Sequence, residues 1–102
     1  MGIDIRVKSE TGQVDGELLD PENLTKSLLA DCRDESSPCL RWVDPYGDTT
    51  FNQLQVPYLI DELNAALEGS SDPKIRAHCQ AVLNLVLRAK NKPHTYVSFS
   101  GD

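Results

Sequence analysis

Two stretches of helical periodicity constrain the fold of this chain more than any other feature, because a proline begins each and few residues separate them. Pro57 predicts the first turn of the first helix, with 52–56 as an irregular or 3₁₀ lead-in and Gly69 at the end. Asp72 and Pro73 begin the second helix in the same way, as a capping residue followed by proline. A connection this short predicts that the two helices pack as an antiparallel pair.

Apolar residues recur at helical spacing in both stretches, which predicts one buried face on each helix. In the first helix this face comprises Leu59, Ile60, Leu63, Ala66 and Leu67. In the second helix it comprises Ile75, Cys79, Val82, Leu83, Val86 and Ala89. The polar residues of the first helix are expected to face water, namely Asp61, Glu62, Asn64 and Glu68.

Strict alternation of apolar and polar residues predicts the outer strands. Residues 3–8 alternate cleanly and 14–18 return as a weaker strand, while 95–99 alternate with Thr95, Val97 and Phe99 inward. Between these strands, Asp20 is predicted to cap a short helix over 21–30 that begins with proline. Its buried face comprises Leu24, Leu28 and Leu29.

The middle of the chain, from Cys39 onward, holds its only tryptophan and its sharpest turn signal. Residues 39–43 and 49–51 are predicted as two short strands, and Trp42 is expected to pack in the core. The connecting residues Asp44-Pro45-Tyr46-Gly47 predict a type I turn, since aspartate, proline and glycine each occupy a favoured position.

These elements follow in the order β-β-α-β-β-α-α-β and predict an α+β domain over residues 1–102. Short, half-polar strands favour a mainly antiparallel sheet of four to five strands, with two long helices and one short helix on one face. The other face is expected to be wet and to carry Asp4, Arg6, Lys8, Arg41, His94, Tyr96 and Ser98.

Charge and composition narrow the partners that the chain can bind. A net charge of −6, spread along the chain, repels nucleic acid and anionic lipid and favours a basic protein partner. No signal peptide precedes the first strand, and no apolar run approaches the roughly 20 residues of a membrane span. Without a secretion signal the three cysteines are expected to be reduced, and the expected location is the cytoplasm.

The sequence offers no clear catalytic, metal or cofactor site. Cys32 and Cys39 are too far apart for a zinc clip, and His78 and Cys79 are adjacent residues on a helix. No glycine-rich nucleotide loop is present. We therefore expect no enzyme activity, no cofactor and no metal, although a hidden site around the histidines and cysteines is an alternative.

Asp44 and Asp48 flank the predicted turn and leave three interpretations open. They could form an acid/base pair or half of a cation site, they could cap and follow the turn, or they could contact a partner. Tyr46 and Tyr58 are expected to be exposed, and exposed tyrosines suit a protein interface. The turn-capping role is favoured because it needs no further residue.

The block from Cys39 to Leu63, containing L-R-W-V-D-P-Y-G-D-T-T-F-N-Q-L-Q, resembles a segment that recurs in small uncharacterised bacterial proteins. The C-terminal P-H-T-Y-V-S-F-S-G-D is similar to the ending of the same group. Small acidic domains of this kind resemble immunity proteins of bacterial toxin systems. That resemblance implies a cytoplasmic protein without a cofactor that blocks one toxin.

The functional expectation is therefore a non-enzymatic binding protein that occludes the basic cleft of a cognate toxin. The expected partner contacts are Asp34, Glu35, Asp44, Tyr46, Asp48, Asp61 and Glu62. The alternative is a structural or adaptor subunit of a larger bacterial assembly, which would bind through the wet face of the sheet.

Overall fold

The computed structural model describes residues 2–33 and 35–101. Its elements are β1 (Asp4–Ser9), β2 (Val14–Leu18), α1 (Leu24–Ala30), the 3₁₀ helix η1 (Leu40–Trp42), β3 (Asp48–Phe51), α2 (Val56–Gly69), α3 (Pro73–Leu87) and β4 (Thr95–Ser100). The predicted α+β class is confirmed, with four strands and three α-helices in the part of the chain that the structure describes.

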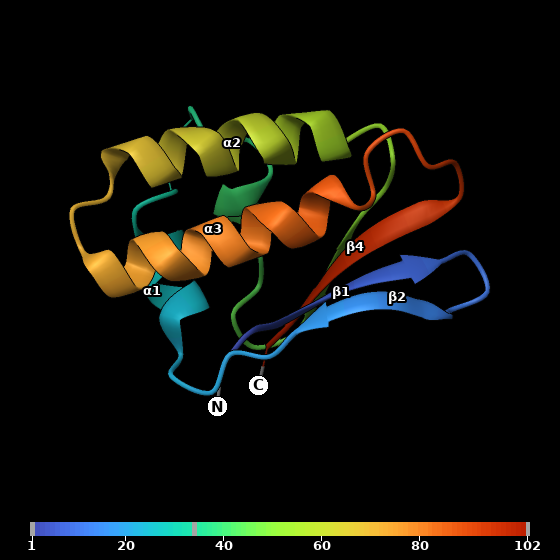
Figure 1. Cartoon of the computed structure of the whole chain (residues 1–102), viewed down its shortest axis with the longest axis horizontal. Helices are drawn as coiled ribbons and strands as arrows, with labels where there is room; N and C mark the ends of the chain where they lie inside the picture. The colour runs from blue at the N-terminus through green and yellow to red at the C-terminus, as the bar shows by residue number, and fades with distance from the viewer. Residues whose placement is uncertain (1, 34, 102) are drawn as a thin grey trace.

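The sheet has the strand order β2-β1-β4-β3, and every neighbouring pair is antiparallel. Ile5 lies opposite Phe99 and Val7 lies opposite Val97, so the two central strands present their apolar side chains to the same face. This register brings the start of β1 beside the end of β4, and the two chain ends therefore lie close together (Figure 1).

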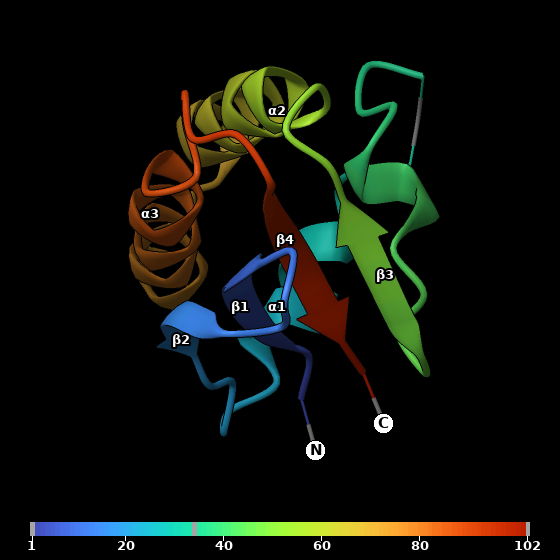
Figure 2. The same ribbon diagram turned by 90° about the vertical axis from the view of Figure 1, so that its right-hand side faces the viewer.

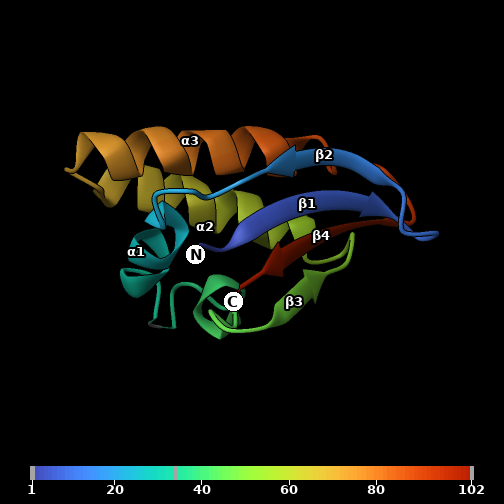
Figure 3. The ribbon, with the colours of Figure 1, turned by 90° about the horizontal axis from the view of Figure 1, so that it is seen from below.

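Two long helices cover that apolar face. α2 and α3 run antiparallel and side by side across the sheet, as the short connection between them predicts (Figure 2). α1 packs against α3 at the end of the sheet where β1 begins (Figure 3). Pro57 lies in the first turn of α2, and the Asp72 carboxylate accepts the N–H of Lys74 at 2.9 Å, so both predicted helix starts are confirmed.

The core lies between the sheet and the helices. Leu63 of α2 and Val82 of α3 are fully buried within it, as are the inward residues of β1 and β4. Phe51 meets Phe99 edge-to-face with ring centroids 5.8 Å apart, which connects β3 to β4 on the covered face. No helix among the described residues has the length and apolar character needed to cross a bilayer.

The strand predicted over residues 39–43 is wrong, and so is the expected core position of Trp42. This segment forms η1 and its C-terminal cap Val43. Leu40 and Val43 are buried, while Trp42 between them is 69% exposed. The spacing of the two buried residues matches one turn of 3₁₀ helix better than the two-residue repeat of a strand. The backbone N–H of Leu40 bonds to a side chain of α2 rather than to a neighbouring strand.

α1 begins three residues later than predicted. Residues 21–22 form a turn and Asn23 adopts a left-handed backbone with φ 57°, so the helix starts at Leu24. Asp20 nevertheless satisfies the start of the helix, because its carboxylate accepts the N–H groups of Leu24 and Thr25. Leu24 itself is only half-buried.

The uncovered face of the sheet holds five of the seven residues expected there. Asp4, Arg6, Lys8 and Tyr96 are half-buried on it, and Ser98 shares the face. The other two expectations are wrong. Arg41 belongs to η1, and His94 precedes β4 in a left-handed conformation with φ 58°. Ser98 points to this face but is only 4% exposed, because its short side chain lies between the neighbouring residues Arg6 and Thr50.

Candidate interaction surface

The turn before β3 forms as predicted, and Asp44 determines its shape. The Asp44 carboxylate accepts the N–H of Tyr46 at 2.9 Å, and the Asp44 carbonyl accepts the N–H of Gly47 at 3.4 Å. Gly47 in turn accepts the N–H of Gly101 at 2.8 Å. A side chain at Gly101 would place its Cβ 2.1 Å from the carbonyl oxygen of Pro45, so only glycine permits this close approach.

One exposed aromatic ring precedes this turn and another belongs to it. Trp42 and Tyr46 are each 69% exposed, and a cation lies over each ring. The Arg41 guanidinium is 4.9 Å from the centre of the Trp42 ring. Lys26 of α1 is 5.3 Å from the centre of the Tyr46 ring and donates to its hydroxyl at 3.4 Å. These contacts hold the two rings in place while leaving most of their area in solvent.

Arg33 adds a third cation, because it donates to the carbonyl of Arg41 at 2.8 Å and so ties the loop after α1 to η1. The sequence analysis did not anticipate that Lys26 and Arg33 contact this region, since neither residue is near the turn along the chain. In the sequence, only the adjacency of Arg41 and Trp42 indicated a cation beside an aromatic ring. The cations balance the acids of the turn, so this region carries both signs of charge.

Glu62 was expected to face water and contact a partner, and the first expectation is wrong because the residue is only 5% exposed. Its Oε1 accepts the N–H groups of Cys39 at 3.1 Å and Leu40 at 2.8 Å. The carboxylate thus caps η1 and joins it to α2. Burial together with this nearby carboxylate raises the pKa of the Cys39 thiol to about 11.

The other predicted contacts divide between the turn and α2. Asp44, Tyr46 and Asp48 lie together at the turn before β3, and Glu35 is exposed in the loop before η1. Asp61 is exposed on α2, as is Tyr58 with 61% of its area in solvent. Asp34 lies outside the described residues.

The acidic side of this surface is α2. This helix carries three acidic residues and no lysine or arginine, whereas Lys26 and Arg41 lie over the aromatic rings at the turn before β3. Because Glu62 joins α2 to η1, the short helix that carries Trp42 adjoins the acidic helix α2. We call the combination of Trp42, Tyr46, Tyr58 and Asp61 the aromatic–acidic surface.

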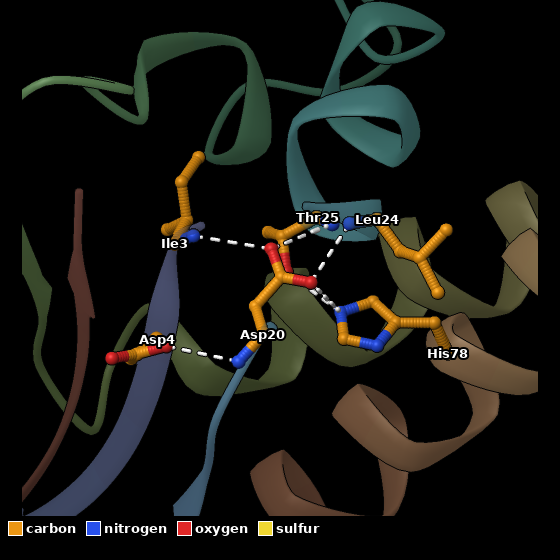
Figure 4. A network of polar contacts seen from close by, with 6 residues as sticks. All are labelled: Ile3, Asp4, Asp20, Leu24, Thr25 and His78. Carbon is orange, nitrogen blue, oxygen red and sulfur yellow. Dashed lines mark hydrogen bonds and ion pairs between the residues drawn. The ribbon is translucent and has the colours of Figure 1, made fainter. Parts of the chain in front are cut away.

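A second polar cluster lies in the interior around Asp20, which is 2% exposed (Figure 4). Its carboxylate accepts the N–H groups of Ile3 at 3.1 Å, Leu24 at 2.8 Å and Thr25 at 3.1 Å. Burial raises the pKa of Asp20, but these N–H donors outweigh burial and hold the pKa below its ordinary value. The carboxylate therefore ties the start of β1 to the start of α1.

His78 of α3 completes this cluster without forming a catalytic triad. Its Nε2 lies 2.7 Å from Thr25 Oγ1 and 3.8 Å from Asp20 Oδ1, so both partners meet the same ring nitrogen. A triad requires the acid and the hydroxyl on opposite nitrogens. Thr25 is also fully buried, so no substrate can reach its hydroxyl. Burial lowers the pKa of His78 and the Asp20 carboxylate offsets only part of this effect, so the imidazole is neutral at pH 7.

Metal ligands do not gather within the described residues, where no group of three or more His, Cys, Asp or Glu side chains could hold an ion. The cysteines in this part of the chain are all buried. One hollow, with a volume of about 290 Å³, lies between the C-terminal ends of α1 and α2. That volume is at the lower end of the roughly 300–1,000 Å³ typical of small-molecule sites.

Comparison with protein-family models, with curated proteins and with solved structures finds no match. The function is therefore inferred from the residues of the chain itself.

Proposed function

We propose that this protein is a non-enzymatic binding module that recognises a protein partner with a basic surface through the aromatic–acidic surface. The observation that carries the proposal is the exposure of Trp42 and Tyr46, each held under a cation. Ordered tryptophan and tyrosine rings are the side chains most enriched among energetic anchors of protein interfaces, and they lose little conformational entropy on binding.

Electrostatics favours a basic partner. The chain has a net charge of −6, and α2 presents Asp61 and Glu68 to solvent without a lysine or arginine on the same helix. Such a helix steers a positively charged partner during the encounter, while the aromatic rings hold it once docked. In the cell we propose that the partner is a cognate toxin domain, whose active cleft the bound protein occludes in the cytoplasm.

The experiment uses calorimetry to measure the affinity of this protein for the product of the gene adjacent to its own. Truncating Trp42 to Ala should weaken binding by at least about 2 kcal/mol if the ring is an anchor, and Tyr46→Ala should act in the same direction. Val14→Ala is the matched control, because Val14 is exposed on β2 at the opposite edge of the sheet from β3. Wild-type affinity in both aromatic variants would remove this surface from the interface. The uncovered sheet face, used by an adaptor subunit, would then be the next candidate.

A further inference from the structure

The hollow between α1 and α2 has a chemical character that the aromatic–acidic surface does not explain. Its lining comes from α1 and the residue after it, from α2 between Glu62 and Gly69, from the loop before η1 and from the residue after α2. The lining residues used below are Asp31, Ser37, Glu62, Ala65, Gly69 and Ser70. Asp31, Ala65 and Gly69 are exposed at its rim, so the hollow opens to solvent.

This lining can accept hydrogen bonds and attracts positive charge. Asp31 and Glu62 supply carboxylates, Ser37 and Ser70 supply hydroxyl oxygens, and no lysine or arginine lines the hollow. The lining therefore favours a positively charged ligand.

Glu62 strengthens this attraction because its charge is buried and has no cationic partner. Two backbone N–H groups bond to the carboxylate, but no lysine, arginine or histidine of the described residues pairs with it. A carboxylate that is 95% buried is weakly screened, and its field extends into the adjoining hollow.

The structure also indicates which cation suits this end of α2. Arg76 of α3 donates through Nη1 to the carbonyl of Leu67 and, at 3.1 Å, to the carbonyl of Ser70. A guanidinium of the chain itself therefore already bonds to the end of this helix. Ser70, whose carbonyl accepts one of these bonds, also contributes to the lining of the hollow.

We propose that the hollow receives the side chain of an arginine residue presented by the partner, an inference that rests on the proposed function. A planar guanidinium with five N–H donors can bond to the Asp31 carboxylate and to the surrounding hydroxyl and carbonyl oxygens at once. A volume of about 290 Å³ suits one long side chain rather than a larger ligand.

The first test needs no partner. The protein is titrated with N-acetylarginine amide, and backbone amide shifts are followed by NMR. N-acetylcitrulline amide is the control ligand, because it has nearly the same shape without the charge. The arginine probe should produce saturable shifts at Ser37, Gly69 and Ser70 and bind about tenfold more tightly than the citrulline probe. Equal binding of the two probes, or no localised shifts, would overturn the inference.

Two variants test whether the arginine probe binds in the hollow. Asp31→Asn should weaken the arginine probe about tenfold through loss of the charged acceptor, and Ala65→Leu should obstruct the hollow. Asn64→Leu is the matched control, since Asn64 is exposed on the same helix but does not line the hollow. If the partner binds normally to both Asp31→Asn and Ala65→Leu, this inference fails. The proposed function then still stands or falls on the Trp42 variant.

Discussion

Replacing Glu62 with alanine tests how much one buried carboxylate contributes to the stability of the fold. Among the described residues, the change removes the only side-chain acceptor of the Cys39 and Leu40 N–H groups, whose residues are 8% and 0% exposed. Each buried N–H left without an acceptor costs about 1–3 kcal/mol. The adjoining hollow admits water to this site, so we expect a total loss of about 2–4 kcal/mol. Such a loss is a large share of the roughly 5–15 kcal/mol typical of a domain.

Glu62→Gln refines the prediction. Oε1 accepts both N–H groups, and Oε2 also accepts that of Cys39 at 3.1 Å. A glutamine whose carbonyl oxygen takes the place of Oε1 keeps one bond to each N–H and should lose the charge assistance and the second contact to Cys39, about 1 kcal/mol. Urea unfolding followed by far-UV circular dichroism measures all variants, with Asp61→Ala as the exposed control. Amide hydrogen exchange should show Cys39 and Leu40 losing protection in Glu62→Ala. A loss under 0.5 kcal/mol, with unchanged exchange at both amides, would refute the capping role.

Three further predictions concern the interior. Leu63→Ala should cost about 2–5 kcal/mol in urea unfolding, because the side chain is fully buried; a loss under 0.5 kcal/mol would contradict its place in the core. The pKa of His78 is below 6.5 in the folded state, so the unfolded chain binds more protons and stability should fall as pH drops below about 6.5. His78→Asn should reduce this dependence of stability on pH. An unchanged dependence would show that His78 is not its cause. Burial raises the pKa of Cys39 and Cys79 from 9.0 to about 11, so native thiols should react with a disulfide reagent more slowly than unfolded ones, and equal rates would contradict their burial.

Local signals predicted much of the fold. The alternation of residues 3–8 and 95–99 fixed which side chains face the core, because a strand with one buried face must alternate. Proline and aspartate at the start of α3 gave its N-terminus correctly, since the capping bonds are made within the first turn. The exposed tyrosines and the Asp44 turn also depend only on neighbouring residues.

The errors arose where a distant partner decides the local structure. Residues 39–43 have the composition of a strand, but Glu62, 23 positions beyond Cys39, accepts their N–H groups and favours a 3₁₀ turn. The same contact explains why Glu62 is buried on a face of α2 that the helical pattern assigns to solvent. Trp42 is exposed because one turn of η1 separates the buried residues Leu40 and Val43.

The site was predicted less completely than the fold for the same reason. The cation over Tyr46 comes from Lys26, 20 residues away, and no periodicity in the sequence connects them. The hollow between α1 and α2 forms from two helix ends and a loop that only tertiary packing brings together. The net charge led to the expectation of a basic partner, but it could not show which part of the surface is acidic in the folded protein.

The most direct test of the proposed function is the association rate with the adjacent gene product, measured by surface-based kinetics over a series of salt concentrations. If the acidic helix steers a basic partner, association should slow markedly as the Debye length falls from about 10 Å at 0.1 M to about 3 Å at 1 M salt. Reversing Asp61 to Lys should lower the on-rate, while Trp42→Ala should chiefly raise the off-rate. The proposal would be contradicted by an on-rate that changes with neither salt concentration nor the Asp61 reversal, together with an off-rate unchanged by Trp42→Ala.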